Sequence, residues 1–600
     1  MNTKIKRAHA LGDFTTNSRL IPISLLAMVI GLISSGVAWV LLRLIGLFTN
    51  LFYYQRWDAR LVSPADNTLG AWAILVPVGG SLIIGLMARY GSERIRGHGI
   101  PEAIESILIN GSRVQPRLAF LKPLSSAISI GSGGPFGAEG PIIMTGGAFG
   151  SMIAQFFHLT SAERKTLLVA GAAAGMSATF ASPVAAVLLA VELLLFEWKP
   201  RSLVPVALAS AAAGAARRYI LGTGPLFPVP SHPVFIGPEG LLGCVICGLL
   251  AGVLSMLLTG AVYASEDAFM KLPIHWMWWP AIGGLVVGIG GLIFPQALGV
   301  GYDTIGNLLQ GHVALGAIAG ILLVKSVIWA VSLGSGTSGG VLAPLLMMGG
   351  ALGGIEAMFL PNEGAGFWPL VSMGAILGGT MRSPLTGIIF ALELTHDVNM
   401  LMPLLAASVI SHAFTVLVLK RSILTEKVAR RGYHLSREYA VDPLEILFVR
   451  DAMRTNLVAF KSDSSLDEVR SALTSKNGQR GQLLYPVIDS KSEFHGVITR
   501  SRLQKLLSDP NPPSGTLADM AIDPVVAYPD EPLRVVVYRM AELGLTRFPV
   551  VDREDRRKLL GMISLRDLLT ARSRNLEEER NRERVLRIRL PLVGRTQRTV

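Results

Sequence analysis

The chain has 600 residues, of which 50% are hydrophobic and only 16% are charged, and its net charge is +13. Soluble globular proteins average about a quarter charged residues, so this composition indicates a membrane protein and excludes a disordered chain or a coiled coil. Two cysteines exclude a disulfide scaffold. The basic residues accompany no nucleic-acid-binding motif, so we expect no nucleic-acid partner.

The charged residues divide the chain into two parts. About 11% of residues 1–440 are charged, against about 31% of residues 441–600. A long apolar part in a membrane and a smaller water-soluble part account for this difference. The predicted domains are an N-terminal segment over residues 1–19, a transmembrane domain over 20–432, a linker over 433–446, a pair of small domains over 447–572 and a basic tail over 573–600.

The first apolar segment runs from Ile21 to about Phe52, too long for a secretory signal and long enough to span a bilayer. Basic residues flank the apolar part at both ends, which predicts cytoplasmic N- and C-termini and an even number of crossings of a prokaryotic-type inner or plasma membrane. Many later segments are short or broken by Gly or Pro, as in transporters and channels. They cover about residues 70–90, 118–134, 140–157, 166–197, 203–220, 238–265, 278–294, 314–333, 341–360, 366–380, 384–396 and 401–420.

The apolar part contains an internal repeat. Residues 131–150 reappear at 334–353, displaced by 203 residues, and residues 182–193 reappear at 383–394, displaced by 201. Small residues are also common wherever membrane helices touch, but the fixed order of these matches predicts a repeat of broken helices. Such repeats place the substrate site where their broken helices meet, near the bilayer midplane.

Three glycine-rich loops each precede a helix, over residues 97–102, 137–141 and 339–344. The free backbone N–H groups and the dipole at a helix N-terminus attract anions. Three converging loops would therefore bind an anion with partial charges, which hold it loosely enough for it to leave. A nucleotide loop is the alternative, but none of these loops ends in Gly-Lys-Ser/Thr or follows a strand pattern.

Glu139 is a carboxylate within an apolar, glycine-rich stretch, where acidic residues are costly and usually functional. Its side chain could occupy an anion position, and protonation would open that position. The alternative is a helix-start acid that accepts hydrogen bonds from free N–H groups. For Glu192 and Glu393, at matched repeat positions, we expect structural hydrogen bonds.

The loops, their spacing and the repeat resemble the CLC family of chloride channels and chloride/proton antiporters over about residues 20–432. The resemblance implies an all-α multi-spanning membrane domain with inverted repeats of broken helices. It also implies a homodimer with one pore per subunit, chloride or another small anion as the transported ligand, no enzyme activity, and no required cofactor or metal.

Carried over by motif, the resemblance implies that Glu139 is the gating glutamate. The residues that it implies for anion binding are His98, Gly99, Ile100, Gly137, Glu139, Gly140, Val341, Leu342 and Leu424.

Three positions depart from the family pattern. His98 stands where many members have serine, so it could donate a hydrogen bond to the anion, add charge when protonated, or simply pack at a helix start. Leu424 replaces a tyrosine that usually meets the anion, and Leu193 replaces an acid that often transfers protons in antiporters. The predicted function is therefore a voltage- or pH-gated chloride channel, with a chloride/proton antiporter as the alternative. A metal-cation transporter regulated by the pair of small domains over residues 447–572 is a more distant alternative.

Residues of about 447–572 contain two similar units, each with an apolar strand at a Pro-Val step followed by a glycine, a strand and a helix. They resemble a cytoplasmic α/β tandem CBS domain. The resemblance implies that Thr499, Ser564 and Asp567 bind an adenine nucleotide. Because Arg502 replaces the acid of the first unit, we expect at most one nucleotide site, and a purely dimerising module is the alternative.

Overall fold

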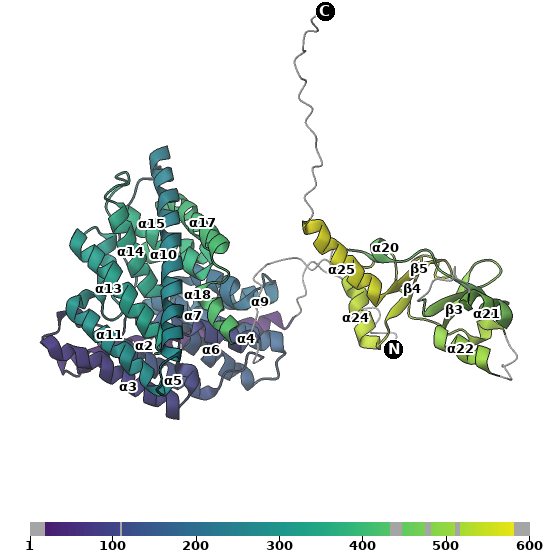
Figure 1. The fold of residues 1–600 in the computed structure, drawn as a ribbon, viewed down its shortest axis with the longest axis horizontal. Coiled ribbons are helices and arrows are strands. Elements are labelled where there is room, and N and C mark those ends of the chain that lie inside the picture. The colour runs from purple at the N-terminus through teal and green to yellow at the C-terminus, as the bar shows by residue number, and fades with distance from the viewer. Residues whose placement is uncertain are drawn as a thin grey trace, which may run out of the picture. The chain divides into compact units, whose positions relative to one another are not determined.

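The computed structural model describes two compact units, Met1–Arg437 and Glu438–Val600, each of which is considered by itself (Figure 1). The predicted N-terminal segment and linker lie almost wholly outside the described residues, and the basic tail is described only as far as Arg580. The described residues are 18–108, 111–431, 444, 447–474, 482–509 and 516–580.

The first unit is built from helices. Along the chain they form two successive series, and one further helix follows the second series. The first series is α2 (Leu20–Tyr54), α3 (Leu75–Tyr90), α4 (Ile100–Leu108), α5 (Pro116–Gly131), α6 (Glu139–Gln155), α7 (Ser161–Phe180), α8 (Pro183–Leu189), the π-helix η5 (Ala190–Leu195) and α9 (Pro200–Ile220). The second is α10 (Pro238–Met270), α11 (Trp279–Ile293), α12 (Tyr302–Leu309), α13 (Leu315–Gly334), α14 (Leu342–Glu356), α15 (Phe367–Met381), α16 (Pro384–Thr395) and α17 (Leu401–Val418), followed by α18 (Ile423–Arg430). Short 3-10 turns lie at η2 (Pro64–Asp66), η3 (Gly70–Ile74), η4 (Glu93–Ile95), η6 (Trp276–Trp278), η7 (Pro295–Ala297) and η8 (Val398–Met400).

The two series break at matched points. Ala181 after α7 and Arg382 after α15 both adopt left-handed backbone, with φ of 57° and 56°, and each lies two residues before a proline. The apolar segment predicted over residues 166–197 is one of the broken segments. The structure divides it into α7, α8 and η5, because Pro183 has no N–H with which to continue a preceding helix.

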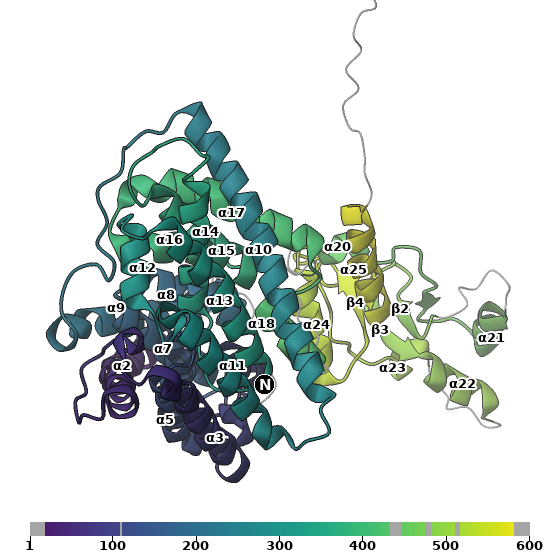
Figure 2. The same cartoon turned by 60° about the vertical axis from the view of Figure 1, so that its left-hand side comes forward.

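Within the described residues, six helical segments are long and apolar enough to cross a membrane. The described chain also has shorter apolar helices such as α14, most of whose residues are buried against their neighbours, and short helices at membrane depth require such packing. The long helix α10 packs on α13, α15 and α17, and Figure 2 shows it along most of its length. The six segments are Leu20–Tyr54, Gly70–Tyr90, Pro238–Met270, Trp276–Ile293, Leu315–Gly334 and Val398–Arg430.

The repeats cap one another's helices. The Glu192 carboxylate accepts hydrogen bonds from the backbone N–H and the hydroxyl of Thr386, at 2.9 and 2.6 Å, in the first turn of α16. The Glu393 carboxylate accepts hydrogen bonds from the N–H groups of Val184 and Ala185 in α8, at 2.9 and 2.8 Å. The structural role predicted for both acids is confirmed, and each acid closes a helix of the other repeat.

The second unit contains two small sheets. In the first, β1 (Phe460–Lys461) pairs in parallel with β2 (Leu484–Ile488), which pairs antiparallel with β3 (Phe494–Thr499). In the second, β4 (Arg547–Val551) pairs antiparallel with β5 (Leu559–Ser564), so the predicted strand pairs at the Pro-Val steps are confirmed. The helices are α20 (Val449–Ala452), α21 (Leu466–Thr474), α22 (Arg500–Ser508), α23 (Leu517–Met520), α24 (Leu533–Leu543) and α25 (Leu565–Arg580).

The cross-repeat caps predict a stability loss when either acid is neutralised. We expect Glu192→Gln and Glu393→Gln each to cost about 1–2 kcal/mol, because a hydrogen bond to a charged acceptor contributes roughly 1.5–3 kcal/mol and glutamine retains part of it. Thermal unfolding in detergent measures the loss. The control is Glu239→Gln, an exposed acid in the first turn of α10. An equal loss in the control would contradict a specific role for the caps.

Candidate anion site

The three glycine loops predicted to precede helices lie in direct contact. The backbone N–H of Gly97 donates to the Thr337 carbonyl at 2.9 Å. Gly137 and Gly340 exchange two backbone hydrogen bonds, of 3.3 and 2.9 Å. Both loops of the first repeat therefore join the loop of the second. We call the meeting point of residues 97–99, 137–140 and 340–342 the loop junction.

Glycine is required where the loops cross. A Cβ atom on Gly140 would lie 1.8 Å from the His98 carbonyl oxygen, and one on Gly99 would lie 2.3 Å from the Gly140 carbonyl oxygen. Gly99 also has φ of +92°, a conformation that other residues rarely adopt. Bare backbone thus brings the N-termini of α4 and α6 together at the loop junction, and α14 begins there too.

Glu139 is the first residue of α6, and its side chain lies in the loop junction. The residue is fully buried. Its Oε2 atom lies 1.7 Å from where a Cβ on Gly137 would be and 2.9 Å from where a Cβ on Gly340 would be. The N–H groups of Glu139 and Ala343 face the carboxylate, but neither of its oxygens has a partner with hydrogen-bond geometry among the described residues. An acidic side chain thus occupies the meeting point of the anion-attracting helix ends.

The other residues implied for anion binding are also buried. Ile100, Val341, Leu342 and Leu424 are 0% exposed. Leu424 lies in the first turn of α18, which packs on α4, and its side chain offers no hydrogen bond.

His98 is nearly fully buried, and its Nδ1 atom has no hydrogen-bond partner in the described parts of the chain. The neighbouring Glu102 carboxylate accepts a hydrogen bond from the Gly99 N–H at 2.8 Å and pairs with Arg431 at 3.4 Å. A histidine that only filled space would not leave a buried ring nitrogen without a partner. This favours the polar interpretation of His98 over simple packing.

A buried lysine donates hydrogen bonds to the backbone of the first loop. Lys122 in α5 is 0% exposed, and its ammonium group donates to the carbonyls of Ile95 and Gly97 at 2.8 Å each. This lysine was not predicted from the sequence, because the loop motifs point only to backbone donors. The available signal was a lysine within an apolar helix, displaced by 203 residues from a second lysine in the other repeat.

That second lysine, Lys325 in α13, is also 0% exposed and repeats the arrangement. Its ammonium group donates to the carbonyls of Ala297 and Gly299 at 2.8 Å each. These carbonyls begin a fourth glycine loop, in which Gly299 and Gly301 have φ of +63° and +77°. This fourth loop precedes α12 as the Gly97 loop precedes α4. Like the two lysines, it was not predicted from the sequence.

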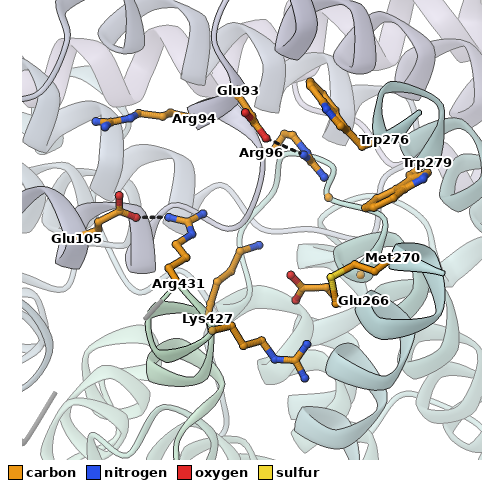
Figure 3. Close-up of a pocket in the computed structure, with 13 residues that line it drawn as sticks. Glu93, Arg94, Arg96, Glu105, Glu266, Met270, Trp276, Trp279, Lys427 and Arg431 are labelled. Atoms are coloured by element: carbon orange, nitrogen blue, oxygen red, sulfur yellow. Dashed lines mark hydrogen bonds and ion pairs between the residues drawn. The ribbon is translucent and has the colours of Figure 1, made fainter. Parts of the chain in front are cut away.

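A cavity of about 660 Å³ adjoins the loop junction (Figure 3). Arg96 lies in its wall with the guanidinium 4.6 Å above the Trp276 ring and 3.1 Å from Glu93. Lys427 also lines it, and its Nζ lies 3.2 Å from where a Cβ on Gly97 would be, which connects the cavity to the first loop. Five cationic residues outnumber three acids here, which favours anions. The lining residues are Glu93, Arg94, Arg96, Glu105, Glu266, Met270, Trp276, Trp279, Gly334, Gly336, Lys427, Arg430 and Arg431.

The residues implied for nucleotide binding lie in the second unit. Ser564 ends β5, and its N–H and hydroxyl donate to Asp567 Oδ2 at 2.9 and 2.5 Å. The other Asp567 oxygen accepts a hydrogen bond from Arg454 Nε at 2.7 Å. Thr499 caps α22 by accepting a hydrogen bond from the backbone N–H of Arg502. Arg502 itself is exposed. Among the described residues, no group of His, Cys, Asp or Glu could hold a metal ion.

Two family models match the chain. The model of the voltage gated chloride channel matches residues 79–416, more than half of the 600 residues. The CBS domain model matches residues 449–509 and 517–574.

Curated proteins are similar over the membrane part. A ClcB-like protein of Ralstonia nicotianae, named as a chloride channel protein, is 30% identical over 364 residues, which are 59% of this chain and 84% of that protein. The H(+)/Cl(-) exchange transporter ClcA of Yersinia pseudotuberculosis is 29% identical over 415 residues, which are 64% of this chain and 84% of that protein.

Solved structures share the fold. A slow cyanobacterial Cl-/H+ antiporter has a TM-score of 0.61 at 21% identity, over 68% of this chain and 97% of that one. A eukaryotic CLC transporter has a TM-score of 0.57 at 18% identity, over 92% of this chain and 98% of that one. The predicted fold class is confirmed. With its two helix series and its loop junction, the chain belongs to the CLC family of membrane chloride transporters and channels, and it carries a tandem pair of CBS domains.

Proposed function

We propose that this chain is a chloride/proton antiporter in which the Glu139 carboxylate couples the two movements. The observation that carries the proposal is this carboxylate, buried in the loop junction without a hydrogen-bond partner in the described chain. The ClcA relative is named as an exchange transporter, and the cyanobacterial structure is named as an antiporter. Both names support an antiporter over the channel that the sequence favoured.

In this mechanism chloride is held by backbone N–H groups at the starts of α4, α6 and α14. The first N–H groups of a helix have no partner within it, and their partial charges attract an anion without the tight hold of a full charge. Ionised Glu139 occupies the loop junction and excludes chloride. A proton neutralises the carboxylate, so that its attraction to the N–H groups falls, the side chain leaves and chloride enters.

We propose the implied set of anion-binding residues as one site around this carboxylate. The buried Nδ1 of His98 would add one side-chain contact to the backbone groups, while Leu424 would add only an apolar wall. The set is His98, Gly99, Ile100, Gly137, Glu139, Gly140, Val341, Leu342 and Leu424.

For the proton we propose Glu266 as the acid that receives it at the cavity. Of the three acids in the cavity wall, Glu93 is paired with Arg96 and Glu105 with Arg431. Among the described residues Glu266 makes no ion pair within 4 Å, so it is the one acid of the three whose carboxylate is not held by a guanidinium group.

A passive chloride channel is the second candidate. Leu193 in η5 is 0% exposed and aliphatic at the position where antiporters of the family often carry an acid. If Glu266 does not replace that acid, the proton route of the family lacks one of its members. Chloride would then move without protons.

We propose further that the protein is a homodimer with cytoplasmic termini. All three loops of the loop junction come from one chain, which supports a separate pathway in each subunit. The basic residues after the last apolar helix support a cytoplasmic position for the CBS pair.

At the CBS pair we propose one adenine-nucleotide site, formed by the second unit with Ser564 and Asp567. The ion pair between Arg454 and Asp567 occupies one carboxylate oxygen, so a ribose hydroxyl would have to displace Arg454 to reach it. The first unit offers Thr499 but no acid, which supports a single site.

Neutralising Glu139 should uncouple the two ions. In liposomes with an imposed chloride gradient, we expect the wild-type protein to drive protons uphill. Glu139→Gln should still carry chloride, independently of pH, without moving protons, because glutamine resembles the protonated carboxyl group. Chloride efflux and internal pH are followed together, with Glu239→Gln as the control. Chloride flux in the wild type without uphill proton movement would favour the channel, and proton pumping by Glu139→Gln would refute the coupling role.

Removing the Glu266 carboxylate should reduce proton flux more than chloride flux. We expect Glu266→Gln to lower proton flux at least about tenfold, the scale expected for loss of a positioned proton-transfer group. Chloride flux through the loop junction should be reduced less. Glu105→Gln, which removes a paired acid of the same cavity, is the control. Equal losses of both ions in Glu266→Gln would count against its proton role.

Nucleotide binding should depend on Asp567. We expect titration of the full-length protein with labelled ATP, ADP and AMP to show one site per chain, weakened at least about tenfold by Asp567→Asn, since one lost hydrogen bond to a charged group has this scale. Asp519→Asn is a matched control, because Asp519 accepts the same N–H and hydroxyl bonds from Thr516. The backbone bond from Thr516 also lowers the pKa of Asp519. Absence of binding by the wild-type protein would leave the dimerising module as the role of the pair.

A further inference from the structure

Lys427 is a partly buried cation of the cavity wall that has no ion-pair partner among the described residues. Three arginines of the same wall are each paired with a carboxylate, at 3.1, 2.5 and 3.4 Å; the pairs are Arg96–Glu93, Arg430–Asp267 and Arg431–Glu102. The Lys427 ammonium group also donates no hydrogen bond within the described chain. A cation withdrawn from water normally has a partner, so this one is available to a ligand.

The Lys427 ammonium group lies where the cavity meets the first loop. Its Nζ atom lies 3.2 Å from where a Cβ on Gly97 would be, and Glu102 Oε1 lies 2.7 Å from the same point. Gly97 directly precedes His98 and is the first residue of the loop junction. Figure 3 shows Lys427 extending from α18 toward the middle of the cavity. The ammonium group therefore stands between the cavity and the loop junction.

Contacts on two sides hold α18 in place without Lys427. The Tyr263 hydroxyl of α10 donates a hydrogen bond to the Ile423 carbonyl, and the Arg430 guanidinium lies 4.6 Å from the centre of the Tyr263 ring. On the other side Arg431 pairs with Glu102 of α4. The direction of Lys427 is thus fixed by other residues of its helix, and its charge is not used to hold the helix.

Lys427 also shares a face of α18 with Leu424. The two residues lie three positions apart, about one helical turn. Leu424 is fully buried in the first turn of the helix and offers no hydrogen bond. Lys427 follows it on the cavity side, where it lines the wall. The polar group that the Leu424 position lacks is therefore present one turn further along the helix.

A full charge at this place can attract an anion without trapping it. Lys427 is only partly buried and borders a cavity of about 660 Å³, so water and dissolved salt weaken its attraction for an anion. Two acids, Glu102 at the same glycine and Glu266 in the cavity wall, offset part of its charge. The remaining attraction suits an ion that has to move on.

We propose that Lys427 is an anion-binding residue at the cavity side of the loop junction, and that its ammonium group sets the affinity with which chloride enters the loops from the cavity. The inference rests on anion transport through the loop junction, which is part of the proposed function. It holds for an antiporter and for a channel alike, because both must bring chloride from the cavity to the loops.

Replacing Lys427 by glutamine removes the charge and keeps much of the side chain. We expect Lys427→Gln to raise the chloride concentration for half-maximal transport about fivefold, the scale of one charge that solvent partly screens. The maximal rate should change less than about twofold, because the residue assists entry and not the later steps. The measurement is exchange of labelled chloride in liposomes containing the full-length protein, with equal chloride on both sides and constant ionic strength.

Two variants serve as controls for the charge. Lys427→Arg keeps a cation at this position and should keep the half-saturating chloride concentration near the wild-type value. Arg94→Gln removes an exposed cation from the same cavity wall, and it should have a smaller effect because an exposed charge is screened more strongly. Thermal unfolding in detergent checks that each variant is folded.

A cysteine at this position tests the charge in a second way. We expect a cationic thiol reagent to restore chloride affinity to Lys427→Cys, and an anionic reagent of similar size to weaken it further. Cys244 and Cys247, the cysteines of the wild-type chain, are both buried, so neither reagent should change the wild-type protein.

The outcomes separate this inference from the proposed function. An unchanged half-saturating chloride concentration in folded Lys427→Gln overturns the inference and leaves the proposed function standing. An equal shift in Arg94→Gln, or no recovery in Lys427→Arg, also overturns it, because the effect then does not depend on a cation at this place. If the wild-type protein carries no chloride, the proposed function fails, and the inference fails with it.

Discussion

The membrane unit depends on a contact of bare backbone between loops that lie far apart in the chain. At Gly140 even one methyl group would overlap the His98 carbonyl, so α4 and α6 can begin side by side only because that position has no side chain. The same loops bring the N-termini of α4, α6 and α14 together at the loop junction. Helix-start N–H groups attract negative charge, and the N–H groups of Glu139 and Ala343 face the buried Glu139 carboxylate there. The backbone contact therefore decides where this acid lies.

The two repeats stabilise this contact with the same side chains used twice. Lys122 and Lys325 each bind two loop carbonyls, and Glu192 and Glu393 each cap a helix of the other repeat. A buried ammonium ion costs several kcal/mol in lost hydration, which only good hydrogen bonds offset. These lysines therefore place positive charge beside the first and fourth loops, and each directs two of its donors to loop carbonyls. The repeat in the sequence thus includes matched charged residues in addition to the Gly/Pro matches.

The two repeats carry different polar groups around their matching loops. The first loop lies beside a cavity lined by more cationic than acidic residues, with His98, Glu102 and Lys427 around it. At the fourth loop Lys325 binds two carbonyls, and Tyr302 stands where the first loop has Ile100. The backbone framework is therefore repeated, while the polar groups around it are not.

Hydropathy, charge distribution and the repeated Gly/Pro pattern determined the membrane class, the two-part organisation, the glycine loops and Glu139, because these features depend on local composition and spacing. Tertiary structure decided the rest. It divided residues 166–197 into three helices and revealed the contacts of Lys122 and Lys325. A lysine in an apolar helix has no role that can be read locally, since the carbonyls that it binds are distant in the chain. Only folding brings those groups within hydrogen-bonding and electrostatic range.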